Sequence, residues 1–130
     1  MSNTSPDMRT PMSRVRHLGS ARSGTGHAWH MRATSIALVP LTLAFVWLVL
    51  TLVGKPYTVV RDTLGAPLPS ILMLLFLLTG IYHMKIGMQA VIEDYVHAEQ
   101  RKQWSLLVNS FFSYAIGLAC VYAVLRISFV

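Results

Sequence analysis

The chain has 130 residues, which is one small domain by length, and 54% of them are hydrophobic while only 12% are charged. This composition excludes a soluble globular domain and indicates a membrane protein. The formal net charge of +6 raises the possibility of nucleic-acid binding, but the basic N-terminal residues lack interleaved aromatic side chains and a recognition motif, so no nucleic-acid partner is predicted.

Residues 1–26 form a basic tail in which four arginines are opposed by a single acid, Asp7. The tail leads into a hydrophobic segment, so its charge is better explained by membrane topology than by a ligand. We therefore expect a basic tail over residues 1–26 and a membrane anchor domain over residues 27–130.

The stretch "GTGHAWHMRAT" lies where the tail meets the first hydrophobic segment, and it brings His27, Trp29, His30 and Arg32 within six positions. Aromatic and basic residues are typical of a membrane interface, so a simple anchor is one interpretation. A guanidinium group also binds carboxylates well, so the other interpretation is a clamp for acidic groups such as the propionates of a haem.

Three segments are long and apolar enough to cross a bilayer, which requires roughly 20 residues. They are residues 31–53, 68–92 and 104–126, separated by a polar loop rich in Pro and Gly and by the short charged loop "EDYVHAEQRKQ". Because helices are the only open-chain structures that satisfy the backbone in lipid, we predict an all-α membrane protein with three transmembrane helices.

Arginine and lysine counts near the helix ends predict the orientation of the chain. The tail and the second loop are richer in these residues than the first loop and the C-terminus, where Arg126 stands alone. We therefore expect a multi-pass membrane protein with a cytoplasmic N-terminus and with the C-terminus on the opposite side of the membrane.

The second segment alone carries ionisable groups at membrane depth, namely His83 and Lys85. At 100° per residue, His83, Gly87, Ala90 and Asp94 share one face of a helix, and the small residues let a helix or a flat cofactor approach closely. A buried imidazole either hydrogen-bonds a neighbouring helix, relays protons or ligates a haem iron, and its position alone leaves these roles open. Lys85 faces elsewhere, and we expect it to extend toward the cytoplasmic interface.

The dipeptide Asp94-Tyr95 ends this segment, eleven and twelve residues after His83. Tyrosines and acids are both common where a helix leaves the membrane, so the dipeptide in isolation is a weak signal. The predicted orientation of the chain places this dipeptide at the cytoplasmic end of the second helix.

Taken together, "GTGHAWHMRAT", the "YH" of the second helix and the following "DY" resemble the small hydrophobic anchor subunit of succinate dehydrogenase, respiratory complex II. The likeness covers roughly residues 20–130 and is strongest to the alphaproteobacterial and mitochondrial forms. It implies a chain that packs with a second three-helix anchor, the cytochrome b subunit, into a haem-binding bundle beneath an iron–sulfur subunit and a flavoprotein. The activity so implied is succinate:ubiquinone oxidoreductase, part of the respiratory chain and the tricarboxylic acid cycle.

The resemblance also implies roles for individual residues. His83 matches the axial ligand that this subunit gives to the iron of one haem b, whose second ligand comes from the partner anchor. Tyr95 and Asp94 match the tyrosine and neighbouring acid of the ubiquinone site. Arg32, and less clearly His30 and His27, match residues near the haem propionates and the quinone pocket.

This chain would be a subunit of an enzyme and would not oxidise succinate itself, because it has no flavin fingerprint and its one cysteine, Cys120, cannot hold an iron–sulfur cluster. Two alternatives remain at this point. One is the anchor of a fumarate reductase that uses menaquinone. The other is a three-helix structural or assembly protein without a cofactor, which would show no haem spectrum.

Overall fold

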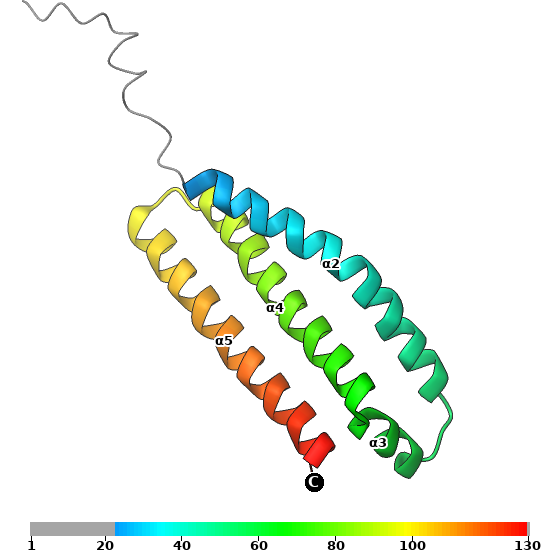
Figure 1. The fold of residues 1–130 in the computed structure, drawn as a ribbon. Helices are drawn as coiled ribbons and strands as arrows, with labels where there is room; N and C mark the ends of the chain where they lie inside the picture. The colour runs from blue at the N-terminus through cyan, green and yellow to red at the C-terminus, as the bar shows by residue number, and fades with distance from the viewer. Residues whose placement is uncertain (1–22, 130) are drawn as a thin grey trace, which may run out of the picture.

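The computed structural model describes residues 23–129, and this part of the chain is built from four helices (Figure 1). They are α2 (Ser23–Leu52), α3 (Tyr57–Gly65), α4 (Pro67–Tyr95) and α5 (Glu99–Phe129). Residues 23–129 contain no β-strand, and α2, α4 and α5 are long and apolar enough to cross a membrane. The prediction of an all-α protein with three membrane-spanning helices is confirmed.

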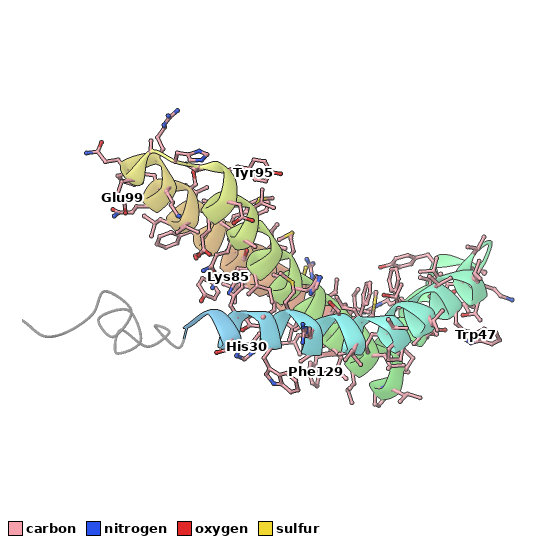
Figure 2. All side chains as sticks on the ribbon, turned by 90° about the horizontal axis from the view of Figure 1, so that it is seen from above. His30, Trp47, Lys85, Tyr95, Glu99 and Phe129 are labelled. Atoms are coloured by element: carbon pink, nitrogen blue, oxygen red, sulfur yellow. The ribbon has the colours of Figure 1, made fainter. Side chains whose placement is uncertain are left out.

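The three long helices form one layer, with α4 between α2 and α5 and packed against both (Figure 1). The start of α2, the end of α4 and the start of α5 lie at one end of the layer, while α3 and the end of α5 lie at the other. Seen from above, α2 runs at an angle to α4 and α5 (Figure 2). The motifs before the first helix and at the end of the second therefore lie at the same end of the molecule.

The helix α2 starts earlier than predicted and includes the whole "GTGHAWHMRAT" stretch. Of the predicted tail, residues 1–22 lie outside the described residues, and residues 23–26 form the first turn of α2. Pro40 lies inside α2 without interrupting it, which is common in lipid because neighbouring helices and local adjustments satisfy the freed carbonyl.

The helix α4 has clear signals at both ends. Pro67 opens it, where a missing N–H has no cost and the fixed φ suits a helix. At its other end the Lys102 ammonium donates to the Glu93 carbonyl at 3.1 Å. A cation at this position offsets the negative end of the helix dipole.

The link between the first two spans is not only a loop, as predicted, because it contains the nine-residue helix α3. Pro and Gly on both sides of this short segment concealed it in the sequence. Its last residue packs closely on α5, since a Cβ on Gly65 would lie 3.0 Å from the Ile127 carbonyl oxygen. Gly54, with φ of 75°, makes the turn that leaves α2.

Almost no apolar side chain is buried within this layer. Among the described residues only Ile86, Ile92 and Val124 are buried hydrophobics, while Trp47 is 72% exposed and Leu118 is 73% exposed. Such a surface cannot face water over two sides of a helical layer. Lipid or other subunits must cover it, as expected for a multi-pass membrane protein.

Candidate functional site

The small-residue face of α4 packs against α2 in an antiparallel register. A Cβ on Gly80 would lie 3.9 Å from the Leu38 side chain, and a Cβ on Gly87 would lie 3.9 Å from the Met31 side chain. His83 lies between these two contacts on the same face. The close approach permitted by the glycines is therefore used by a helix of the same chain.

His83 is half-buried, and its Nδ1 lies 2.8 Å from the hydroxyl oxygen of Thr34 on α2. The hydrogen bond to a neighbouring helix, one of the roles left open by the sequence, is therefore present. It occupies only one of the two ring nitrogens. Nε2 has no partner among the described residues, so it is available to a group supplied from outside the chain.

His27 and His30 also lie against α4. The Nε2 of His27 lies 3.2 Å from the Ile86 carbonyl oxygen, and the His30 ring meets the Tyr82 ring edge-on with centroids 6.0 Å apart. The structure thus brings both histidines beside the turn of α4 that carries His83.

Arg32, unlike His27 and His30, does not lie against α4 near His83. It is exposed, and it lies two positions before Thr34, about 200° around α2. Its guanidinium group has no hydrogen bond or ion pair with another residue in 23–129. No carboxylate within residues 23–129 is bound to it.

Asp94 and Tyr95 are the last residues of α4. The Tyr95 side chain is 78% exposed and projects from the end of the layer (Figure 2), and Asp94 is exposed too. Neither side chain has a hydrogen-bond partner among the described residues. A phenol and a carboxylate are thus left free side by side where the helix ends.

A groove between α4 and α5 begins close to this end. Its volume is about 470 Å³, and Met84 and Met88 line it from the face of α4 that also carries Tyr95, by helical spacing. The remaining lining is Ile92, Trp104, Ser105, Val108, Asn109 and Phe112. The groove is largely apolar.

The expectation that Lys85 extends toward the interface is not met. Its ammonium group donates to the Tyr114 hydroxyl at 2.9 Å and lies 4.3 Å from the centroid of that ring. Asn109 donates to the Lys85 carbonyl at 2.9 Å. The cation is therefore held by α5 within the span, on a face of α4 away from His83.

We expect Tyr114→Phe to destabilise the folded protein by about 1–3 kcal/mol, because it removes the only oxygen that binds the Lys85 ammonium among the described residues while keeping the ring. Thermal unfolding of the purified protein in detergent measures this loss. Tyr122→Phe is the matched control, since Tyr122 lies on the same helix, is 65% exposed and has no hydrogen bond within residues 23–129. Equal melting temperatures for the two variants would contradict the assignment.

Thr34 is the residue that sequence reasoning missed. It was visible in the "RAT" of the first motif, and it lies four residues after His30 and seven after His27, the spacing of one helix face. What the sequence did not contain was the identity of the α4 residue opposite that face.

Within residues 23–129 no three His, Cys, Asp or Glu side chains gather around a point that could hold a metal ion. A haem iron differs, because a protein chain need supply only one axial ligand to it. His83, with one ring nitrogen free, has the chemistry for that ligand.

Comparison with known proteins shows the family to which the chain belongs. The family model described as succinate dehydrogenase/fumarate reductase transmembrane subunit matches residues 6–117. The succinate dehydrogenase hydrophobic membrane anchor subunit of Paracoccus denitrificans is 32% identical over 117 residues, which cover 90% of this chain and 90% of that protein. The same subunit of Rickettsia bellii is 30% identical over 118 residues, covering 91% and 94% of the two chains.

A more distant relative is the corresponding subunit of Rickettsia conorii, 25% identical over 118 residues. No solved structure matches the chain significantly. The chain therefore belongs to the family of succinate dehydrogenase and fumarate reductase transmembrane subunits, and its relatives are hydrophobic membrane anchors of succinate dehydrogenase.

Proposed function

We propose that this membrane anchor subunit gives one axial ligand, Nε2 of His83, to a haem b shared with a second anchor subunit, and that Tyr95 and Asp94 form part of the ubiquinone site. The observation that carries the proposal is that only one of the two nitrogens of the His83 ring has a hydrogen-bond partner among the described residues. Nδ1 is bound to Thr34 at 2.8 Å, while Nε2 has no partner among the described residues. A ring held in this way is typical of a metal-binding histidine.

The residues around His83 fit a haem. His83 lies eleven residues before Asp94 on an unbroken helix, so the two residues are roughly 16 Å apart along the helix axis. Arg32, His30 and His27 lie nearer the start of α2, at the Tyr95 end of the layer. They are the groups of this chain that would meet the propionates. The haem would supply a one-electron carrier within the bilayer.

At the quinone site, Tyr95 would donate a hydrogen bond to a quinone carbonyl oxygen. Reduction of a quinone to a quinol takes two electrons and two protons, and negative charge builds on the carbonyl oxygens as electrons arrive. A hydroxyl donor stabilises that charge. Asp94, free and exposed beside it, would orient the site or pass protons from water.

The other subunits would carry the remaining chemistry. This chain has one cysteine, so the iron–sulfur clusters, which need several, belong to a partner, and a flavoprotein would oxidise succinate. The exposed faces of α2 and α5 are available to the second anchor and to lipid. Because basic residues flank the Tyr95 end, we place that end and the N-terminus on the cytoplasmic side of the bacterial inner membrane, and the C-terminus on the periplasmic side.

Purification of a tagged copy from its native membranes tests the proposal. We expect a flavoprotein, an iron–sulfur protein and a second anchor to co-purify, with a haem b spectrum and succinate:ubiquinone reductase activity. A purified complex that contains no haem would refute the ligand role. A tagged chain that brings no flavoprotein would favour the structural or assembly protein considered above.

A further inference from the structure

We propose that Thr34 is a positioning residue that sets the tautomer, the orientation and the donor strength of the His83 ring toward the haem iron; this inference rests on the proposed function. Thr34 lies on α2 and His83 on α4, so the contact joins two helices 49 positions apart in the chain. Neither the family match nor the site motifs assign it a role.

The proton positions follow from counting donors. The Thr34 hydroxyl oxygen lies 2.8 Å from the His30 carbonyl oxygen, 3.1 Å from the Met31 carbonyl oxygen and 2.8 Å from Nδ1 of His83. A hydroxyl has one hydrogen, and carbonyl oxygens only accept. The two carbonyls of its own helix therefore take that hydrogen.

The lone pair of the Thr34 oxygen is then left to accept a hydrogen bond, so Nδ1 of His83 must carry the hydrogen. The reverse arrangement would direct the hydroxyl hydrogen to Nδ1 and leave two oxygen atoms 2.8 Å apart with no hydrogen between them. In a neutral imidazole only one nitrogen is protonated. Nε2 thus presents its lone pair, as an iron ligand must.

The same contact fixes the ring. A threonine in a helix has few χ1 rotamers, and Thr34 is further held by its bonds to its own backbone. The Gly80 and Gly87 contacts on either side keep α2 and α4 close at this level. The ring is therefore oriented before any iron binds, which lowers the ordering cost of ligation.

A histidine that donates its second N–H to an oxygen is a stronger base at the metal-bound nitrogen. A stronger donor favours the more positive, oxidised iron. Loss of the Thr34 hydroxyl should therefore raise the midpoint potential of the haem and weaken its retention. Loss of such a partner typically lowers metal affinity by about 10–100-fold.

The test compares three variants in the complete membrane complex. Thr34→Val removes the hydroxyl and keeps the shape, Thr34→Ser keeps the hydroxyl, and Thr42→Val is the matched control, because Thr42 is an exposed threonine on the same helix. The measurements are the rate of haem transfer to apomyoglobin and the midpoint potential from a redox titration followed in the visible spectrum.

We expect Thr34→Val to lose haem at least tenfold faster than wild type and to show a higher midpoint potential, with Thr34→Ser and Thr42→Val close to wild type. If Thr34→Val assembles poorly, Thr34→Ala lacks the same hydroxyl and gives the same readouts. Wild-type values for both quantities in the hydroxyl-free variant would overturn the inference. A haem that is absent from the wild-type complex, or retained in His83→Ala, would instead overturn the proposed function on which it rests.

Discussion

His83→Ala is expected to abolish the haem b spectrum of the membrane complex or to leave a weakly held, altered haem. The reason is that the variant removes one of the two proposed axial ligands, and Thr34, the neighbour of the ring in this structure, offers only a hydroxyl in its place. Difference spectra of dithionite-reduced membranes, with haem quantified against the complex, measure the effect.

The matched control is His97→Ala. His97 is exposed in the loop after α4, where its Nδ1 lies 3.1 Å from the Tyr95 carbonyl oxygen, and its loss should leave the haem content unchanged. An imidazole added to His83→Gly membranes should restore part of the low-spin spectrum. An unaltered spectrum in His83→Ala would show that this histidine serves only the contact with α2.

Tyr95→Phe is expected to lower succinate:ubiquinone reductase activity by about 10²-fold, the usual effect of removing one hydrogen-bond donor from a developing oxyanion. The haem spectrum should not change, because Tyr95 lies twelve residues from His83 on a continuous helix. Succinate oxidation with a water-soluble dye as the acceptor should not change either, since the dye bypasses the quinone.

The control for Tyr95→Phe is Tyr122→Phe, which removes an exposed phenol from the C-terminal part of α5. Both variants remove one exposed phenolic hydroxyl, but only Tyr95 adjoins Asp94. Wild-type quinone reduction in Tyr95→Phe would remove this residue from the proposed quinone site. Equal losses in the two variants would indicate a general effect on the membrane domain.

The helical fold was predictable because its physical cause lies in single segments. A run of apolar residues long enough for the bilayer, with few charges and with prolines before the second span, predicts a helix without reference to the rest of the chain. The helix α3 escaped prediction because nine residues between Pro and Gly clusters have too little pattern of their own. The packing of α3 on α5 through Gly65 is a tertiary contact, which the sequence of the segment itself does not reveal.

The candidate site was only half predictable for a related reason. Helical periodicity places His83, Gly87 and Asp94 on one face, but it cannot say which helix that face meets. The contact with Thr34 and the capture of Lys85 by Tyr114 both depend on how α2 and α5 pack on α4. The proposed roles of Arg32, Tyr95 and Asp94 depend in addition on groups outside residues 23–129, because their side chains have no hydrogen-bond partner within that range.

The central claim is that Nε2 of His83 is an iron ligand while Nδ1 is held by Thr34. A cryo-electron microscopy map of the complete complex, purified from its native membrane, tests it most directly. We expect a porphyrin whose iron lies within bonding distance of Nε2, with the Thr34 hydroxyl still against Nδ1. A His83 ring that faces lipid or a plain helix neighbour, with the iron bound elsewhere or no porphyrin present, would contradict it.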